Sequence, residues 1–386
     1  MERFDQDPAD PAFVQDPYPA YDRARSLGEI VWWADYGMAA AVSHSAVQQV
    51  LKSRAMGRVP LDPALIADHT RAFYDIEAHS MLELEPPRHT RLRSLVLRAF
   101  TGRRVRALAP EIEALCDELI AALPDAPFDL LTAYAQPLPV RIIARLLGVP
   151  EEMAPDLLQW SNSMVAMYQT GRDRAVEDAA AAAARDFAAF LRGYVENRRA
   201  APADDLITHL IAAEEDGERL TTDELISTCI LLLNAGHEAT VHTMGNGVAA
   251  MLREGVRSVD EPLVEEIMRY DPPLHLFTRW VYEDTEIAGM PLKRGDQVAC
   301  LLGAANRDPA VWPDPHRFDP TRPVQAHSAF GAGLHFCVGA PLARLELLIG
   351  LRKLMDAHPG LRLCKPPRFG NTYHFHGLEA LMVSKS

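Results

Sequence analysis

One long helical stretch constrains the fold of this chain more than any other feature. Thr221 and Glu224 have the spacing of a capping box, in which the first residue caps a helix and the fourth reaches back to it. The pattern that follows stays helical to about Leu252, which at about 1.5 Å per residue gives a length of about 46 Å. A helix of this length crosses a whole domain, and other elements must bury its middle. The sequence therefore predicts a fold arranged around one central helix.

Helical patterns fill much of the remaining chain as well. Apolar spacing and alanine-rich composition predict further helices at 43–51, 88–100, 110–122, 137–147, 151–168, 174–199, 260–270 and 341–357. Apolar–polar alternation predicts strands over 278–302 and in the tail, whereas we expect 1–35 to be irregular and 54–86 to be a long loop with a helical piece. The sequence shows no internal repeat or linker. We therefore expect one continuous, mainly α fold with a minor β region over residues 1–386.

Charge and composition exclude several classes of protein. With 39 Lys and Arg against 53 Asp and Glu, the net charge of −14 disfavours general binding to nucleic acid or to anionic membranes. No apolar run approaches the roughly 18 residues that span a bilayer, and the first residues lack the apolar core of a secretion signal. The five cysteines are widely spaced and form neither a disulfide framework nor a CxxC metal site. We expect a cytoplasmic protein in a reducing compartment.

The stretch FGAGLHFCVGAP contains the cysteine best suited to chemistry. Its glycines, Gly331, Gly333 and Gly339, permit a tight or left-handed backbone close to a flat ligand, and Pro341 suits the first turn of a helix. Cys337 therefore lies just before a helix N-terminus, where free N–H groups and the macrodipole favour a thiolate. Such a thiolate suits a soft metal ion, although a buried cysteine in a glycine-rich turn is the alternative.

This stretch resembles the haem-binding loop of the cytochrome P-450 family, whose pattern is Phe-Gly-x-Gly-x-x-x-Cys-x-Gly. The resemblance implies that Cys337 is the proximal thiolate ligand of the iron of haem b, with Gly331 and Gly339 beside the cofactor. It also implies that His335 binds a haem propionate and that Phe330 packs near the ring. The chain is too short for a monooxygenase fused to its own reductase, so a separate electron donor is expected.

Three more residues match the propionate-binding positions of the family. His89 and Arg93 lie four apart on one face of the helix expected at 88–100 and match its His-x-x-x-Arg pattern, and Arg279 is similar to the third partner. Two carboxylates that enter a protein interior need donors or cations, because an unpaired buried charge is costly. Each residue alone could be a solvated surface cation, but all three occur together with the cysteine loop.

A second pattern is structural rather than catalytic. Glu266 and Arg269 lie three apart on one helix face, which by itself is consistent with a surface ion pair. They also resemble the family's Glu-x-x-Arg, and Arg317 follows at the matching distance. The resemblance implies that these three residues form a Glu-Arg-Arg network behind the haem.

The middle of the long helix reads AGHEAT and contains an anomaly. A glycine inside a helix costs about 1 kcal/mol relative to alanine, so Gly236 needs a compensating reason. The motif resembles the family's (Ala/Gly)-Gly-x-(Asp/Glu)-Thr, which implies that Ala235 and Gly236 lie where the helix bends around bound O₂ and that Glu238 relays protons. Ala239 stands where the family usually has Thr, and Thr240 comes one residue later, about 100° around the helix.

Three explanations of this departure are open. A hydroxyl group on the substrate, with ordered water, could replace the missing side chain, as in some macrolide-hydroxylating relatives. Thr240 could reach the site if the helix is locally unwound. Otherwise the enzyme performs unusual chemistry or releases peroxide. We favour the first explanation.

Arginines are concentrated between Pro86 and Pro110, where there are seven and no acid. Complementary charge speeds the encounter of two proteins, so this cluster predicts a docking patch for an acidic ferredoxin-like donor. A solvated helix face with propionate contacts is the alternative, and nucleic acid fits poorly because aromatic residues are not interleaved. The predicted patch comprises Arg88, Arg91, Arg98, Arg103 and Arg104.

The resemblance also implies an apolar substrate pocket with a few polar groups, suited to a medium-sized lipophile. Its expected lining is Met81, Leu82, Met164, Met167, His275, Leu276, Phe277, Tyr373, His374 and Phe375. The expected activity is insertion of one oxygen atom from O₂ into this substrate, with electrons from NAD(P)H through a ferredoxin. Two alternatives are a haem-thiolate enzyme that desaturates, couples or rearranges its substrate, and a haem-based ligand sensor.

Overall fold

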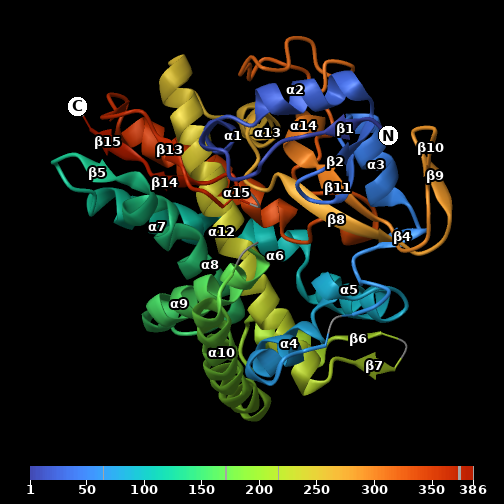
Figure 1. Cartoon of the computed structure of the whole chain (residues 1–386). Coiled ribbons are helices and arrows are strands. Elements are labelled where there is room, and N and C mark those ends of the chain that lie inside the picture. Colours follow the sequence, from blue (N-terminus) through green and yellow to red (C-terminus); the bar gives the residue numbers. More distant parts are fainter. Residues whose placement is uncertain (64, 170–171, 216, 373–374, 386) are drawn as a thin grey trace.

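The central helix is present as predicted in the computed structural model, which describes residues 1–386 except 64, 170–171, 216, 373–374 and 386. Helix α12 spans Thr222–Glu254 and crosses the molecule (Figure 1). The Thr221 side chain accepts from the Glu224 backbone, and the Glu224 carboxylate accepts from the Thr221 backbone. Gly255, in the left-handed region, ends the helix.

Helices surround α12 and bury most of its length. Helix α10 (Arg174–Ala200) packs on α9 (Ala154–Val165) and on α12, and its alanines at 180 and 184 are fully buried, so small side chains allow close packing. After the N-terminal segment, the described residues also form α3 (His44–Lys52), α4 (Arg71–Glu77), α5 (Arg88–Ala99), α6 (Gly102–Ala107), α7 (Ala109–Ala121), α8 (Pro137–Leu147), α11 (Leu206–Ala212), α13 (Glu261–Tyr270), α14 (Leu302–Asn306) and α15 (Ala340–Ala357).

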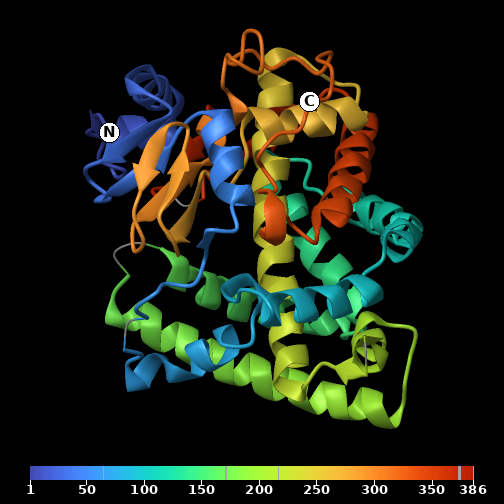
Figure 2. The same cartoon turned by 90° about the vertical axis from the view of Figure 1, so that its right-hand side faces the viewer.

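Strands form a smaller region beside the helices (Figure 2). The largest sheet of the described chain has the order β1-β2-β3-β11-β8-β4, with β11 parallel to β3 and antiparallel to β8. Its strands are β1 (Arg3–Phe4), β2 (Ile30–Trp33), β3 (Met38–Ala41), β4 (Met56–Gly57), β8 (Leu276–Val281) and β11 (Gln297–Leu301). A three-stranded sheet has the order β12-β15-β5, with β5 (Phe128–Asp129), β12 (Arg362–Leu363) and β15 (Met382–Ser384). Strand pairs are formed by β6 (Glu214–Glu215) with β7 (Glu218–Arg219), β9 (Thr285–Ile287) with β10 (Met290–Leu292), and β13 (Arg368–Phe369) with β14 (Leu378–Ala380).

The N-terminal segment departs from the sequence-based prediction. Residues 1–35 were expected to be irregular, but they contain β1, β2, α1 (Pro11–Gln15) and α2 (Tyr18–Leu27). The prolines that suggested irregular structure lie in the first turns of both helices, where a missing N–H costs nothing. Tyr21 and Trp33 are fully buried, so this segment has a core of its own against the sheet.

The mainly α prediction is confirmed. Each predicted helix, from 43–51 to 341–357, has a counterpart whose ends lie within a few residues of the predicted ones. Helices α6 and α11 were not predicted, since both are short and depend on packing for their stability. Within the described ranges, no helix has both the length and the apolar character needed to cross a membrane.

Candidate functional site

The Cys337 loop is held in one shape by its backbone. The Cys337 N–H donates to the carbonyl of Phe330 at 3.0 Å, which closes the loop. Gly331 and Gly333 both have φ +68°, a conformation that L side chains rarely adopt. A Cβ atom on Gly333 would lie 2.3 Å from the carbonyl oxygen of Leu51, so no other residue fits there. Helix α15 then begins at Ala340, as the sequence predicted.

Cys337 is half-buried, and its surroundings act on the thiol in opposite directions. Burial raises the pKa of Cys337 above its ordinary value, although the backbone N–H groups of Gly339 and Ala340 oppose this shift by hydrogen bonding to sulfur. A metal ion deprotonates a coordinating thiol outright. The loop therefore offers a sulfur ligand with two N–H groups already directed at it.

One face of α12 is open although the helix runs through the core. Ala235 is exposed at the middle of the helix, and Glu238, Ala239 and His242 on the same face are partly exposed. Residues on the other faces, such as Val241 and Met244, are buried. These exposed and partly exposed positions recur at helical spacing and form one strip along α12. Gly350 of α15 packs against the Met244 side chain, so the helix that follows the Cys337 loop adjoins this part of α12.

Four donors and cations are gathered near the loop. The rings of His89 and His335 lie 4.4 Å apart between centroids. Arg93 donates to the carbonyl of Phe336 at 2.6 Å, and Arg279, which is only 3% exposed, donates to the carbonyl of Thr278 at 2.8 Å. His89 and Arg93 lie on α5 and Arg279 lies on β8, at the positions matched in the sequence. His335 belongs to the cysteine loop.

Among the described residues, Glu85 is the carboxylate that bonds a member of this group, through His335, and His89, Arg93 and Arg279 form no ion pair there. Nδ1 of His89 is buried and has no hydrogen-bond partner among the described residues. Burial, followed by the nearby His335 and Arg93, lowers the pKa of His89 to about 4, and burial lowers the pKa of Arg93 and Arg279 as well. Buried cations with carbonyl partners and an orphaned nitrogen fit a ligand that carries two carboxylates. The residues present therefore fit a haem with two propionates.

Glu85 is the carboxylate that the sequence analysis missed in this region. It accepts a hydrogen bond from His335 Nε2 at 3.2 Å and another from the Arg58 backbone at 2.6 Å. Burial alone would raise the pKa of Glu85, but these hydrogen bonds outweigh burial and lower it. His335 is thus held in place by a protein carboxylate. No local pattern predicts this contact, because 250 residues separate the partners.

The centre of α12 is helical throughout, since α12 runs as one continuous helix from Thr222 to Glu254. The bend around O₂ that the resemblance implies at Gly236 stays a prediction. A Cβ atom on Gly236 would lie 2.7 Å from Cδ1 of Ile143 in α8. The Ile143 side chain would have to shift for any larger residue at 236, so the close approach of α8 to α12 favours glycine here despite its low helix propensity.

Two polar side chains beside Ala239 differ in their hydrogen bonding: the Thr240 hydroxyl has a partner, and one carboxyl oxygen of Glu238 has none among the described residues. Thr240 is 4% exposed, and its hydroxyl donates to the carbonyl of Gly236 at 3.0 Å. Because the helix is intact and this hydroxyl is occupied, Thr240 does not reach the open face, and local unwinding is excluded as an explanation. One carboxyl oxygen of Glu238 is buried without a hydrogen-bond partner among the described residues, and burial raises the pKa of Glu238 to about 7.

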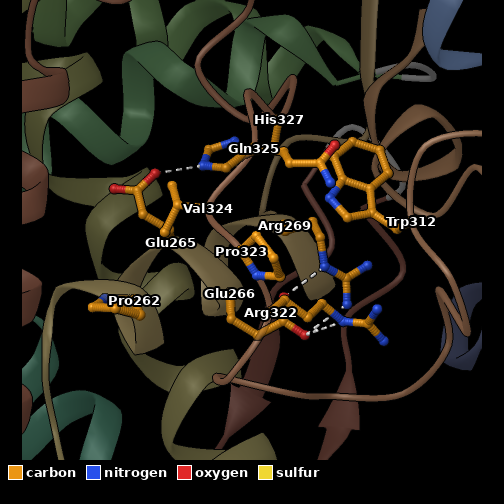
Figure 3. A pocket seen from close by; sticks show the side chains of 10 residues that line it. All are labelled: Pro262, Glu265, Glu266, Arg269, Trp312, Arg322, Pro323, Val324, Gln325 and His327. Carbon is orange, nitrogen blue, oxygen red and sulfur yellow. Dashed lines mark hydrogen bonds and ion pairs between the residues drawn. The ribbon is translucent and has the colours of Figure 1, made fainter.

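The structural network contains a different second arginine from the one predicted. Glu266 and Arg269 form two hydrogen bonds, at 2.6 and 2.8 Å, and both side chains are nearly fully buried (Figure 3). Arg322 lies 3.5 Å from the Glu266 carboxylate and is the third member. The prediction of Arg317 is wrong, because its side chain is 70% exposed and turns toward Asp319. Only the Arg317 carbonyl takes part, by accepting from Arg269 at 3.2 Å.

Several predicted pocket residues lie elsewhere. Leu276 packs in the N-terminal core cluster, and His275, 0% exposed, bonds the hydroxyl of Tyr21 at 2.7 Å. Both were wrong as pocket residues. Met164 is also 0% exposed, and its sulfur accepts from Asn234 at 3.8 Å, so it belongs to the core.

Other predicted pocket residues remain candidates. Phe277 is partly buried against Gly331, and Phe375 lies 6.0 Å from His242 between ring centroids. Met81 and Met167 are nearly buried, and Leu82 is half-buried. Tyr373 and His374 lie outside the described residues.

Some arginines of the predicted patch form ion pairs with carboxylates of this chain. Arg91 forms ion pairs with Glu224 and with Glu218, the latter at 3.2 Å, and Arg88 lies 3.8 Å from Glu224. Arg104 lies 3.6 Å from Asp204, whereas Arg103 is exposed. Arg88 and Arg91 therefore connect α5 to the start of α12, although the Arg88 side chain keeps 42% of its surface exposed.

The elements described above define a class of protein. A sulfur ligand at a helix start, next to buried cations that require carboxylates, is the arrangement of a haem-thiolate protein. Phe330 contributes to the same region, with the Arg344 guanidinium 4.6 Å from its ring centroid.

Comparison with known proteins gives the family. A sequence profile described as cytochrome P-450 matches residues 261–357. The cytochrome P-450 monooxygenase PikC of Streptomyces venezuelae is 37% identical over 380 residues, which cover 92% of this chain and 87% of that protein. The 6-deoxyerythronolide B hydroxylase of Saccharopolyspora erythraea is 40% identical over 296 residues, which cover 74% of this chain and 72% of that protein. This chain belongs to the cytochrome P-450 family.

Solved structures agree with this assignment. The structure of P-450 BioI in complex with an acyl carrier protein ligated to hexadec-9Z-enoic acid has a TM-score of 0.92 and 31% identity, covering 97% of this chain and 99% of that chain. The protein is accordingly a P-450 oxidoreductase with a haem cofactor, and the family uses O₂, a substrate and a redox partner.

Proposed function

We propose that the protein inserts one oxygen atom from O₂ into a medium-sized lipophilic substrate that carries a hydroxyl group. One catalytic unit, residues 1–386, would bind haem b and receive electrons from NAD(P)H through a ferredoxin reductase and a ferredoxin. The observation that supports the proposal is that Cys337 lies near the half-buried Arg93 and the buried Arg279, which donate to backbone carbonyls, and near His89, whose Nδ1 has no partner among the described residues. When bound there, the haem would supply the activation of O₂ at its iron.

The residues of the chain have separate tasks in this proposal. Cys337 would supply the sulfur ligand to the iron, and His89, Arg93, Arg279 and His335 would bind the propionates and so orient the cofactor. Phe330, Gly331 and Gly339 shape the loop so that it can approach a flat group closely. Ala235 leaves open the space that O₂ and the substrate require.

Glu238 holds and releases protons at its carboxyl oxygens. Because burial raises its pKa to about 7, the carboxyl is partly protonated near neutral pH and can both accept and release a proton. Ala239 has no hydroxyl, and that of Thr240 is bonded to the Gly236 carbonyl. We therefore assign the missing hydroxyl to the substrate, acting with ordered water.

The names of relatives support an oxygenated natural product as the substrate class. One relative is a hydroxylase of 6-deoxyerythronolide B, and PksS of Bacillus subtilis is named as a cytochrome of polyketide biosynthesis. Compounds of this kind are apolar overall and carry hydroxyl groups. Phe277, Phe375, Met81, Met167 and Leu82 would supply the apolar contacts.

The electron donor would dock near the Cys337 loop. Leu334 and Phe336 of this loop are 42% and 40% exposed, which is high for large apolar side chains. Arg98, Arg103 and Arg104 would supply positive charge around them, and an acidic ferredoxin would complement both features.

A second reaction class deserves a test because Ala239 removes a group used for O₂ activation in the family. A haem-thiolate enzyme that desaturates, couples or rearranges its substrate would not transfer oxygen to the product. Turnover under ¹⁸O₂ distinguishes the two, since insertion places one labelled atom in the product.

The absorption spectrum of the reduced, CO-bound protein tests the proposed ligand directly. We expect the thiolate spectrum in the wild type and in Cys364→Ala, whose cysteine is exposed and distant in sequence from the loop. Cys337→Ala should lose it. An unchanged spectrum in Cys337→Ala, or a wild type that binds no haem, would rule out the assignment.

A further inference from the structure

His242 is a buried titratable group that the reaction described above does not use. It lies four residues after Glu238 on the open face of α12, so their side chains are neighbours, with about 5–6 Å between Cβ atoms. Its Nδ1 is buried and has no hydrogen-bond partner among the described residues, as is true of one carboxyl oxygen of Glu238. Two orphaned polar atoms on adjacent turns of one helix call for a common explanation.

The C-terminal segment is shaped around the His242 ring. A Cβ atom on Gly377 would lie 2.2 Å from His242 Nδ1, so any larger residue would displace the imidazole. Asn246, one turn further along α12, donates to the carbonyl of His376 at 2.9 Å and fixes this segment against the helix. His242 therefore lies directly beside the backbone next to His376.

His376 continues the path away from the open face. Its Nδ1 bonds the Asp271 carboxylate at 2.9 Å, and its Nε2 is buried without a partner among the described residues. The Asp271 side chain keeps 14% of its surface exposed and also accepts from the Tyr18 hydroxyl at 2.7 Å. Glu238, His242, His376 and Asp271 thus form a series of titratable groups that ends at a carboxylate with 14% of its surface exposed.

The groups around His242 keep it uncharged. Burial, then the nearby His237 and His376, lower the pKa of His242 to about 4. A neutral imidazole has one donor and one acceptor nitrogen, so it accepts a proton on one side and releases one on the other. Glu238 and His237 from α12 and His376 from the C-terminal segment are the titratable groups that act on this ring or lie one turn from it.

A metal site explains the outer end of the path less well. Ligand atoms of Asp271, His275 and His376 lie within 4.8 Å of one another. However, Asp271 and His376 already bond each other, and the Arg307 guanidinium lies 3.3 Å from the Tyr18 ring centroid, which places a positive charge beside the cluster. A hydrogen-bonded network therefore accounts for these contacts without an added cation.

We propose that His242 and His376 carry protons between the partly exposed Asp271 and Glu238 on the open face of α12. The proposal rests on the monooxygenase function, in which substrate, O₂, two electrons and two protons give the hydroxylated product and water. Each proton enters an imidazole at one nitrogen as another leaves from the second nitrogen, with bridging water where the side chains do not touch, so no net charge accumulates. His242 acts through Glu238 and is therefore a positioning and proton-transfer residue.

Variants of both histidines test the path in the haem-loaded enzyme. His242→Asn and His376→Asn keep polar side chains of smaller size but cannot pass a proton between two nitrogens. We expect each to slow product formation by about tenfold or more. Each should also raise both the peroxide released per NADH and the solvent deuterium isotope effect. The double variant should be no worse than the more severe single variant, because both interrupt one path. His237→Asn is the matched control, since both ring nitrogens of His237 have partners, at 2.9 and 3.3 Å.

A measurement without turnover complements the kinetics. In the reduced, CO-bound enzyme labelled with ¹⁵N-histidine, we expect the His242 resonances to report a neutral ring between pH 6 and 8 and to shift in His376→Asn. A His242 that charges within this range, a fully coupled His242→Asn, or multiplicative effects in the double variant would overturn the proposal. Failure of the monooxygenase assignment would instead appear in the wild type, as a missing thiolate spectrum or unlabelled product.

Discussion

The hydroxyl of Thr240 donates a hydrogen bond to the carbonyl oxygen of Gly236, 3.0 Å away and one turn earlier in α12. Thr243 makes the same contact with the carbonyl of Ala239 at 2.7 Å. Both hydroxyls are therefore used within the helix, as is common for Thr in helices. The open face around residue 239 has no hydroxyl from either of these side chains, so hydroxyl-assisted proton delivery there depends on the substrate.

Restoring the usual residue with Ala239→Thr tests this dependence. The added hydroxyl would occupy the place of ordered water and the substrate hydroxyl, so coupling with the native substrate should change, with more peroxide released per NADH. With a substrate analogue that lacks the hydroxyl, the same variant should release less peroxide than the wild type. Unchanged coupling for both compounds would remove the basis for assigning the hydroxyl to the substrate.

The pH dependence of turnover should follow Glu238. Its carboxyl can donate a proton only while protonated, and burial raises its pKa to about 7, so kcat should fall as the pH rises through about 7. Glu238→Gln cannot titrate and should lose this limb, with a decrease in kcat of about 100-fold at pH 6. Steady-state rates from pH 5.5 to 9 with saturating substrate and redox partners measure both. If kcat of Glu238→Gln still falls as the pH rises through about 7, a group other than Glu238 controls this decrease.

Stability measurements can distinguish Arg322 from Arg317. Arg322→Ala removes one partner from the buried Glu266 carboxylate and should lower the free energy of unfolding by about 1–3 kcal/mol. Arg317→Ala is the control, because its side chain is 70% exposed, and should change it by less than about 0.5 kcal/mol. Urea unfolding of both haem-loaded variants gives the comparison. Equal losses would mean that the Arg317 side chain takes part after all.

The packing of α8 on α12 predicts a cost for Gly236→Ala. The new methyl group would lie 2.7 Å from Cδ1 of Ile143, so we expect a loss of about 1–3 kcal/mol. Ile143→Val removes that atom and should restore part of the loss in the double variant. Gly193→Ala in α10 is the control, since nothing lies within 4 Å of the added atom, and should stabilise by about 0.5–1 kcal/mol. Thermal unfolding of the four variants measures these changes, and a neutral Gly236→Ala would contradict the packing argument.

Local patterns predicted the helices and the residues around Cys337, because helix caps, apolar spacing and the glycine loop are encoded within a few neighbouring positions. Leu276 and Phe277 illustrate a limit of such patterns. Neighbours on a strand face opposite sides, so both could not line one pocket, and only the packing of β8 shows that Phe277 contacts the loop. Only the path of the loop that contains both arginines shows that Arg322, rather than Arg317, reaches Glu266. The role of Glu85 depends on a contact with His335, which is distant in the sequence.

The ion pairs between Arg91 and Glu224 also have a kinetic consequence. Positive charges already neutralised inside the molecule contribute little to the field that an approaching donor encounters. That field therefore comes from fewer arginines than the seven in the sequence, and salt screens exposed charges over about 10 Å at 0.1 M. The rate of electron delivery should consequently fall only gently with rising ionic strength, and contact with the exposed Leu334 and Phe336 would then set much of the affinity for the donor.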